Sequence, residues 1–244
     1  MKENKKNNST KSKTPSKIII ELQDVWKTYA LGAIEVQALR GLSLAVKKGE
    51  FAAIMGPSGS GKSTSMNIVG CLDLPTRGKV LLDGQDIALF HESDLAAIRG
   101  RKIGFVFQSF NLISSLSALE NVTLPMIFQN IPEEKRISIG TKLLEKVGLG
   151  KRLHHKPTEL SGGEQQRVAI ARSLCNDPEI ILGDEPTGNL DSVAGKVVMD
   201  LLRKLHKEEK KTIIIVTHDK NVGAQAERIF HLKDGKLERI EVRK

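Results

Sequence analysis

The 244-residue chain has few cysteines, few aromatic residues and no long apolar segment. Its two cysteines, Cys71 and Cys175, lie far apart, which favours reduced thiols in or near the core over a disulfide or a metal site. No apolar run approaches the roughly 20 residues that a membrane-spanning helix needs. The first apolar residues, Ile18–Ile20, are followed at once by Glu21, so a signal peptide is not expected. We therefore expect the protein to remain in the cytoplasm.

The net charge of +9 is unevenly distributed, because residues 1–17 contain six lysines and one glutamate. With Asn, Ser, Thr and Pro between the lysines, this segment cannot bury a core and is predicted to be a disordered basic tail. Such a tail can attract anionic lipid or nucleic acid, or it can be solvated without a function. The rest of the chain is mildly basic and has no basic helix or aromatic stacking platform. Nucleic acid is therefore not an expected partner.

Strand and helix patterns alternate along the chain, which predicts an α/β fold with a mostly parallel sheet covered by helices. Residues 92–150 have helical periodicity with little strand signal, and an inserted helical subdomain is predicted over about 90–165. The expected strands are 18–29, 38–46, 51–55, 79–82, 180–182 and 212–217, and the other expected helices are 61–72, one beginning near 160, and 193–207.

The segment GPSGSGKST, residues 56–64, follows an apolar strand and precedes a helix. In that context the pattern G-x-x-x-x-G-K-[ST] predicts a phosphate-binding loop rather than a chance glycine-rich turn. The backbone N–H groups of residues 59–61 can surround phosphate oxygens, and Lys62 supplies a positive charge. The hydroxyl of Ser63 can bind Mg²⁺.

The segment IILGDEPTGNLD, residues 180–191, places two adjacent carboxylates at the end of an apolar strand. In parallel sheets this edge is where ligands bind. We expect Asp184 to hold Mg²⁺ through water and Glu185 to act as the base that orients an attacking water. A role as simple helix-capping acids is disfavoured, because adjacent carboxylates repel each other without a cation.

Two further polar residues follow predicted apolar segments in the same way. His218 comes directly after the strand 212–217, and Gln108 follows the apolar residues 103–107. A lone histidine is usually structural, but its position beside the phosphate-binding loop favours a catalytic role. Gln108 can coordinate Mg²⁺ or the attacking water.

A second glycine-rich helix start lies at LSGGEQQ, from Leu160. Ser161 and Glu164 have the spacing of a capping box. Gly162 and Gly163 fall in the first turn, where each costs roughly 1 kcal/mol relative to alanine without a structural return. A helix start that allows close approach to its backbone is suited to an anion, which predicts a second phosphate site.

With these motifs in order, the chain from Ile18 onward resembles the ATP-binding-cassette (ABC) ATPases. The motifs are Walker A, Q-loop Gln108, the signature LSGGE, Walker B ending at Asp184-Glu185, D-loop 189–191 and switch His218. The resemblance implies a P-loop NTPase fold with a mostly parallel core sheet, an N-terminal antiparallel β-subdomain and an inserted α-helical subdomain. It also implies ATP and Mg²⁺ as cofactors. The residues expected to contact ATP in the same chain are Tyr29, stacking on adenine, and Gly56, Pro57, Ser58, Gly59, Ser60, Gly61, Lys62, Ser63 and Thr64.

The resemblance also implies which phosphate the second site binds. In this family two cassettes pair head to tail, and the signature of one faces the Walker A nucleotide of the other. Ser161, Gly162 and Gly163 are therefore expected to contact the γ-phosphate held by the partner of a homodimer, and the glycines allow that close approach.

Two segments, GCLDLPTRGKV and FVFQSFNLISSLSALENVTLP, look like the lipoprotein-releasing and macrolide-export branch of the family. That branch implies a permease partner of few spans (FtsX-like) and a peripheral location on the cytoplasmic face of the inner membrane. The departures from the usual pattern are small: Glu164 replaces the commoner glutamine, and Gly183 replaces an alanine. The alternatives are a cassette that drives a membrane protein mechanically, as in cell division, and a DNA-repair or translation ATPase.

Overall fold

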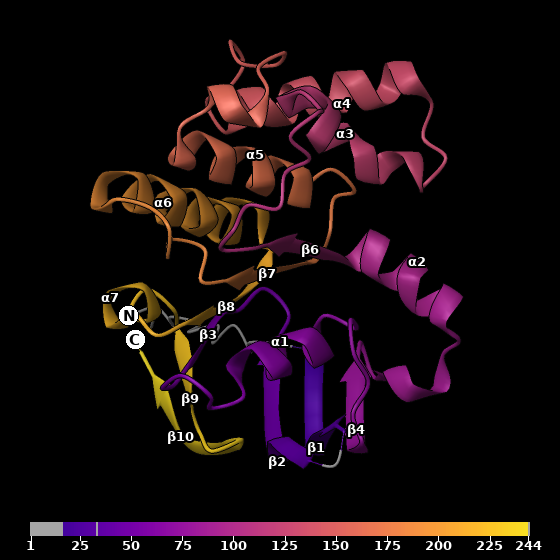
Figure 1. Cartoon of the computed structure of the whole chain (residues 1–244), viewed down its shortest axis with the longest axis vertical. Coiled ribbons are helices and arrows are strands. Elements are labelled where there is room, and N and C mark those ends of the chain that lie inside the picture. The colour runs from indigo at the N-terminus through magenta and orange to yellow at the C-terminus, as the bar shows by residue number, and fades with distance from the viewer. Residues whose placement is uncertain (1–16, 33, 244) are drawn as a thin grey trace, which may run out of the picture.

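The computed structural model describes residues 17–32 and 34–243, so the basic tail expected over residues 1–17 lies outside the described part except for Lys17. The described residues form two β-sheets and a set of helices (Figure 1). In chain order the elements are β1 (Ile18–Leu31), β2 (Ile34–Lys47), β3 (Phe51–Met55), α1 (Lys62–Val69), β4 (Arg77–Leu82), β5 (Gln85–Asp86), η1 (Ile87–Leu89), α2 (Glu92–Lys102), β6 (Ile103–Val106), α3 (Ala118–Ile127), α4 (Glu133–Lys146), η2 (Pro157–Glu159), α5 (Gly162–Ser173), β7 (Ile180–Asp184), α6 (Ser192–Glu209), β8 (Thr212–Thr217), α7 (Lys220–Gly223), β9 (Arg228–Lys233) and β10 (Lys236–Val242).

The larger sheet has the strand order β10-β9-β3-β8-β7-β6. All neighbouring strands in it are parallel except β9 and β10, which are antiparallel. The mostly parallel core sheet is thus confirmed. The strands β6, β9 and β10 were not predicted, and β6 has only four residues inside the region that was expected to be helical. Pairing with β7 places β6 in the sheet, pairing with β3 places β9 there, and β10 pairs with β9.

Alternation along β3 divides the core into two layers, because successive side chains point to opposite faces of a sheet. Phe51, Ala53 and Met55 pack in one cluster with residues of α5, α6 and α7. Ala52 and Ile54 pack in the other cluster with residues of α1, α2 and the smaller sheet. The larger sheet is therefore covered on both faces, as a buried parallel sheet requires (Figure 1).

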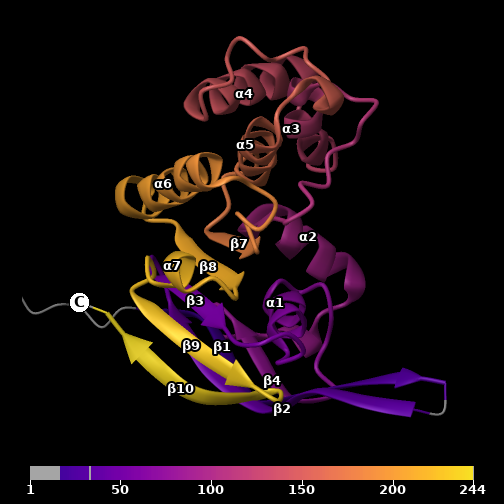
Figure 2. The same ribbon diagram turned by 60° about the vertical axis from the view of Figure 1, so that its left-hand side comes forward.

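The smaller sheet has the order β2-β1-β4-β5 and is antiparallel throughout. This confirms the expected N-terminal antiparallel β-subdomain. The β1–β2 hairpin extends away from the body of the molecule (Figure 2). In it Tyr29 lies opposite Val36.

Helices α3, α4 and α5 share a third apolar cluster at one end of the molecule (Figure 1). This supports an inserted α-helical subdomain. The range expected for it, about 90–165, also includes α2 and β6, which pack elsewhere. Leu95 of α2 belongs to the apolar cluster that includes Ala52 and Ile54 of β3, and β6 pairs with β7 in the larger sheet. The limits of the subdomain remain a prediction.

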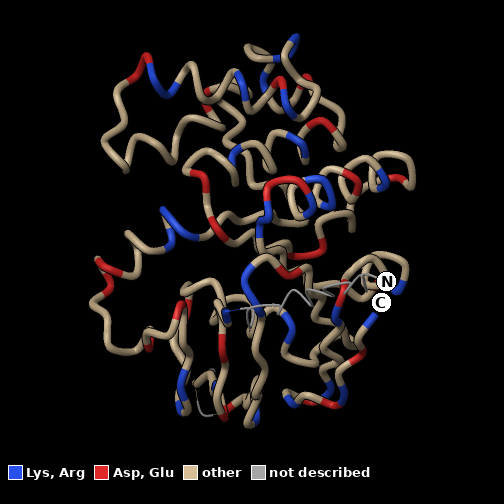
Figure 3. Tube along the Cα trace, turned by 180° about the vertical axis from the view of Figure 1, so that it is seen from behind, with Lys and Arg blue, Asp and Glu red and all other residues tan. Residues whose placement is uncertain are grey.

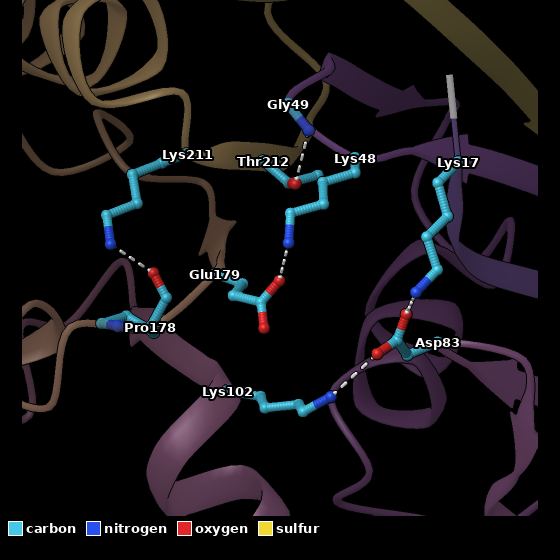
Figure 4. A network of polar contacts seen from close by, with 9 residues as sticks. All are labelled: Lys17, Lys48, Gly49, Asp83, Lys102, Pro178, Glu179, Lys211 and Thr212. Atoms are coloured by element: carbon cyan, nitrogen blue, oxygen red, sulfur yellow. Dashed lines mark hydrogen bonds and ion pairs between the residues drawn. The ribbon is translucent and has the colours of Figure 1, made fainter. Parts of the chain in front are cut away.

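At the amino ends of the parallel strands, lysines bind acceptors from the same chain (Figure 4). Asp83 accepts from Lys17 at 2.6 Å and from Lys102 at 3.2 Å. Lys48 pairs with Glu179, the residue before β7. Acidic and basic residues are interspersed along the rest of the trace (Figure 3). The lysines at this edge are therefore neutralised within the chain.

Candidate functional site

The carboxyl ends of β3, β7 and β8 meet at the opposite edge of the larger sheet. Met55 at the end of β3 pairs with Thr217 at the end of β8, and Asp184 at the end of β7 pairs with Val216. The residues that follow these strands are therefore neighbours, although Met55 precedes Asp184 by more than a hundred positions. The sequence expectation for this edge is met.

The loop between β3 and α1 has the conformation that its glycines permit. Gly59 and Gly61 have φ of +76° and +93°, in the left-handed region that favours glycine. A Cβ at Gly61 would also lie 2.6 Å from the carbonyl oxygen of Ala38 on β2. The ammonium of Lys62 donates to the carbonyl oxygen of Pro57 at 2.8 Å. The loop is thus wrapped around the start of α1, with its lysine held inside it.

A cavity of about 990 Å³ lies against this loop. Most of the residues expected to contact nucleotide line it, and so do Val36, Gln37 and Arg40 of β2, which were not predicted. Ser60 is buried instead, and its Oγ has no hydrogen-bond partner among the described residues. The lining residues are Tyr29, Val36, Gln37, Ala38, Arg40, Pro57, Ser58, Gly59, Gly61, Lys62, Ser63, Thr64, Asp184, Glu185, Val216 and His218.

The carboxylates of Asp184 and Glu185 differ in their surroundings. Burial, together with the neighbouring Glu185, raises the pKa of the Asp184 carboxyl, and Lys62 opposes this shift. Glu185 has φ of +44°, an uncommon conformation for a residue other than glycine. Two such groups side by side on a half-buried strand end favour a bound cation.

Three contacts from β8 and the residue after it hold the Glu185 carboxylate. His218 Nδ1 lies 2.6 Å from Oε1, and the His218 backbone N–H donates to the same oxygen at 3.0 Å. The hydroxyl of Thr217 donates to Oε2 at 3.0 Å. The structure therefore brings together the predicted base and the predicted switch histidine, and it adds Thr217.

Gln108 lies on the loop after β6 rather than in the cavity, and Asn189 lies on the loop after β7. Nε2 of Gln108 donates to Oδ1 of Asn189 at 3.2 Å, and Nδ2 of Asn189 donates to the Gln108 carbonyl oxygen at 3.1 Å. A Cβ at Gly188 would lie 2.8 Å from the same amide nitrogen. The two polar side chains thus pair across the two loops. A role for Gln108 as a metal ligand remains a prediction.

The capping box at the start of α5 is confirmed. Oγ of Ser161 accepts from the backbone N–H of Glu164 at 3.3 Å, and the Ser161 N–H donates to the Glu164 carboxylate at 2.9 Å. Hydrogen bonds from the Ser161 backbone and then its hydroxyl hold the pKa of Glu164 below its usual value. The capping box therefore occupies the N–H groups of Ser161 and Glu164 and does not involve those of residues 162 and 163.

The two glycines of the same turn have different surroundings. A Cβ at Gly163 would lie 2.8 Å from the Cβ of Ala194, so its absence lets α5 and α6 approach each other. The expectation that these glycines have no structural return is wrong for Gly163. A Cβ at Gly162 would meet only Leu190 and Phe110, at an ordinary 3.6 Å each. The fold therefore has room for a side chain at position 162 but not at position 163.

Within one chain the signature residues and the phosphate-binding loop are not brought together, because residues 161–163 do not line the 990 Å³ cavity. A residue that sequence reasoning missed connects the motifs instead. Gln166 of α5 is fully buried, and its Nε2 donates to the carbonyl oxygens of Phe107 at 3.3 Å and Pro186 at 2.6 Å. Its spacing of four residues from Ile170 indicated an inward position.

A protein-family model described as ABC transporter matches residues 39–188. An uncharacterized ABC transporter ATP-binding protein of Thermotoga maritima is 55% identical over 227 residues, which cover 93% of this chain and 97% of that protein. The macrolide export ATP-binding/permease protein MacB of Hyphomonas neptunium is 50% identical over 219 residues, which cover 90% of this chain. That match spans only 34% of MacB.

The solved structures show the same similarity. Dimeric MJ0796 of Methanocaldococcus jannaschii, an ATP-binding cassette in a post-hydrolysis state bound to ADP and Pi, superposes with a TM-score of 0.85. It is 51% identical, and the match covers 91% of this chain and 98% of that one. None of the described helices is both long and apolar enough to cross a membrane.

Proposed function

The chain belongs to the ABC transporter family, and we propose that it works as a homodimer around two MgATP to drive an integral-membrane permease. It is an ATP-binding cassette with ATPase activity. The proposal concerns which residues carry out each part of that activity and what the activity is coupled to.

We propose that the phosphates of ATP bind to the loop of residues 56–64. Its N–H groups at the start of α1 favour an anion, because the helix dipole adds to their hydrogen bonds. Lys62 would exchange its bond to the Pro57 carbonyl oxygen for one to a phosphate. The adenine base would stack on Tyr29, which lines the same cavity.

We propose that Ser63, Asp184 and Gln108 hold Mg²⁺ together with phosphate oxygens. In the described part of the chain no group of three or more His, Cys, Asp and Glu side chains could hold a metal by itself. A set of one carboxylate with hydroxyl, amide and phosphate oxygens suits Mg²⁺, which prefers oxygen ligands and retains waters. When bound, Mg²⁺ neutralises charge on the phosphates. Gln108 would have to leave Asn189 to reach it.

We propose that Glu185 orients the attacking water and accepts its proton. The observation that carries this assignment is the 2.6 Å contact between Glu185 Oε1 and His218 Nδ1 at the wall of the cavity. His218 and Thr217 fix the carboxylate, so one of its oxygens is directed by the protein before a substrate arrives. A preorganised base of this kind contributes typically 10²–10⁴-fold to a rate.

We propose that a second copy completes the site through Ser161 and the backbone of residues 162 and 163. These residues lie outside the cavity of their own chain, at a helix start that favours an anion. The similarity to a dimeric cassette supports this arrangement. Each chain would then supply half of two sites.

We propose a permease of few spans as the driven partner, with the cassette peripheral on the cytoplasmic face of the inner membrane. The support is the 50% identity to MacB, which combines an ATP-binding part with a permease. The transported compound would be a lipoprotein or another hydrophobic or peptide compound. Co-purification of a membrane protein would support this partner, and co-purification of nucleic acid instead would contradict it.

Replacing Glu185 with Gln tests the catalytic assignment. The amide keeps the size of the side chain and loses the carboxylate, so ATP hydrolysis should fall by about 10²-fold or more. ATP binding should persist, since the loop of residues 56–64 is unchanged. The variant should therefore accumulate as an ATP-bound dimer, which size-exclusion chromatography with MgATP detects.

Glu179→Gln is the matched control, because Glu179 lies just before the opposite end of β7 and pairs with Lys48 (Figure 4). It should hydrolyse ATP at nearly the wild-type rate. A Glu185→Gln protein that remains monomeric and hydrolyses ATP like the wild type would contradict the assignment.

A further inference from the structure

Three side chains form a bonded group beside the nucleotide cavity. The hydroxyl of Tyr29 donates to Oδ2 of Asp73 at 2.9 Å. The ammonium of Lys27 donates to Oδ1 of the same carboxylate at 2.5 Å, and to the carbonyl oxygen of Leu74 at 2.8 Å. The Lys27 and Asp73 side chains are 14% and 28% exposed, so their ion pair is shielded from water more than a surface pair.

The protonation states of Asp73 and Tyr29 at neutral pH favour these hydrogen bonds. Burial by itself raises the pKa of the Asp73 carboxyl, but the hydrogen bonds from Lys27 and Tyr29 outweigh it and leave the pKa below its usual value. Burial, and then Asp73, raises the pKa of the Tyr29 hydroxyl. Asp73 is therefore an ionised acceptor and Tyr29 a protonated donor at neutral pH.

Lys27 also occupies one face of the Tyr29 ring. Its Nζ lies 5.0 Å from the ring centroid, within the range of a cation–π contact. Lys27 and Tyr29 are two positions apart on β1, so their side chains project from the same face of the strand. Tyr29 also lines the cavity, so the same residue contacts Lys27 and borders the space for a ligand.

We propose that Asp73 and Lys27 are positioning residues that hold the Tyr29 ring as a one-sided stacking surface for the base of ATP. The inference rests on the adenine-stacking role proposed above for Tyr29. Asp73 holds the ring through the Tyr29 hydroxyl, and Lys27 covers the ring face that does not stack on adenine. A ring ordered in advance loses less conformational freedom when the nucleotide binds.

This group could not be predicted from local sequence patterns. Asp73 lies 44 positions from Tyr29, in the turn after α1, within the segment GCLDLPTRGKV. Hydrogen bonds between β1 and the turn 73–76, among them Thr76 N–H to the Trp26 carbonyl oxygen at 2.8 Å, bring the two together. The turn after the phosphate-binding helix thereby contacts a residue that lines the cavity.

The experiment compares two ligands, MgATP and magnesium tripolyphosphate, which has the phosphates without the base. The full chain is titrated by calorimetry. Asp73→Ala should weaken MgATP binding by about 3- to 10-fold, the scale for ordering one side chain, and leave tripolyphosphate binding unchanged. Asp73→Asn, which keeps an acceptor for the Tyr29 hydroxyl, should restore part of the loss.

Tyr29→Phe removes the same hydrogen bond from the other side and should resemble Asp73→Ala. Because both act through one bond, the double variant should bind MgATP little worse than either single variant. Lys27→Met keeps much of the length of the side chain without the charge and should also weaken MgATP alone. Asp83→Ala is the control, since Asp83 likewise pairs with lysines but lies at the other edge (Figure 4).

Equal losses for MgATP and tripolyphosphate would overturn the inference, and so would additive effects of Asp73→Ala and Tyr29→Phe. An unchanged MgATP affinity in Asp73→Ala would also overturn it. The variant Tyr29→Ala distinguishes a failure of the positioning role from a failure of the proposed adenine contact. If it binds MgATP like the wild type, the adenine contact itself is wrong. If it binds weakly while Asp73→Ala is unaffected, only the positioning role is wrong.

Discussion

The helices α1 and α5 both begin at glycine-rich turns, and their first turns are satisfied in different ways. At α1 the residue before the helix is Gly61, which has no side chain to cap the free N–H groups. At α5 it is Ser161, whose hydroxyl and backbone are bonded to Glu164. The first turn of α1 is therefore not capped by a side chain, whereas the capping box of α5 occupies the N–H groups of Ser161 and Glu164 and does not involve those of residues 162 and 163.

The difference follows from where each helix start lies. The start of α1 lines a cavity formed by its own chain, so a phosphate can replace a missing cap there. The start of α5 lies outside that cavity, and a polar helix end without a partner would be destabilised while the chain is alone. A cap made of its own side chains keeps α5 intact until a second copy arrives.

The largest expected difference between the two starts is in nucleotide binding by a single chain. Lys62→Ala should weaken MgATP binding by at least about 30-fold, the scale for removing one partner of a charged pair. Ser161→Arg should leave binding by the monomer unchanged and abolish hydrolysis, because it acts only in the dimer. Calorimetry on monomeric protein measures the first effect and phosphate release the second.

Lys48→Ala is the control for Lys62→Ala, because its ammonium pairs with Glu179 away from the cavity. Normal MgATP binding by Lys62→Ala would contradict the role of this loop. Weak binding by monomeric Ser161→Arg would mean that α5 serves its own chain.

A mixed dimer of the two variants tests the comparison in one assembly. Both lesions fall in the same composite site when one chain carries Lys62→Ala and the other Ser161→Arg, and the second site stays intact. Hydrolysis should therefore recover partly relative to either homodimer. Differently tagged chains, purified as the mixed dimer, allow the measurement. Activity no higher than in the homodimers would count against the arrangement between chains.

The two glycines of α5 should separate stability from function. Gly163→Ala places a methyl group 2.8 Å from Ala194 and should lower stability by about 1–3 kcal/mol, which corresponds to a fall in Tm of roughly 2–10 °C. Gly162→Ala meets no close neighbour and should keep or raise Tm, because alanine favours the helix. It should nevertheless reduce ATP hydrolysis, since its methyl group narrows the approach of the partner's phosphate.

Calorimetric melting and a steady-state ATPase assay on both variants give the two readings. If Gly162→Ala retained full activity, close approach at this residue would be unnecessary. An unchanged Tm for Gly163→Ala would mean that α5 and α6 adjust without loss.

The smallest expected effect concerns the charge on the cap of α5. Glu164→Gln keeps the acceptor for the Ser161 N–H and removes a negative charge next to the incoming phosphate. In a Glu185→Gln background, the ATP-dependent dimer should become roughly 2- to 5-fold tighter, the scale of a charge at a helix end. Sedimentation at several protein concentrations measures this.

The control is Glu120→Gln, because Ser117 and Glu120 form the same capping box at the start of α3. It should leave dimerisation unchanged. A weaker dimer with Glu164→Gln would mean that the carboxylate supports the interface rather than opposing it.

Much of this molecule follows from local sequence. The phosphate-binding loop, the capping box of α5 and the apolar strands β3, β7 and β8 depend on residue types at short spacing, which fix backbone conformation and burial. The carboxyl-edge position of Asp184, Glu185 and His218 also followed, because parallel strands bring their ends to one edge.

Tertiary structure alone decided the remaining features. The packing of α6 against α5 requires a small residue at Gly163, but no such contact constrains Gly162. Tertiary structure also paired Gln108 with Asn189, and Asp73 with Tyr29. Each of these depends on a contact between segments at least 31 residues apart, as from Gly163 to Ala194. Local pattern cannot specify such contacts, because they arise from how whole helices and strands pack against one another.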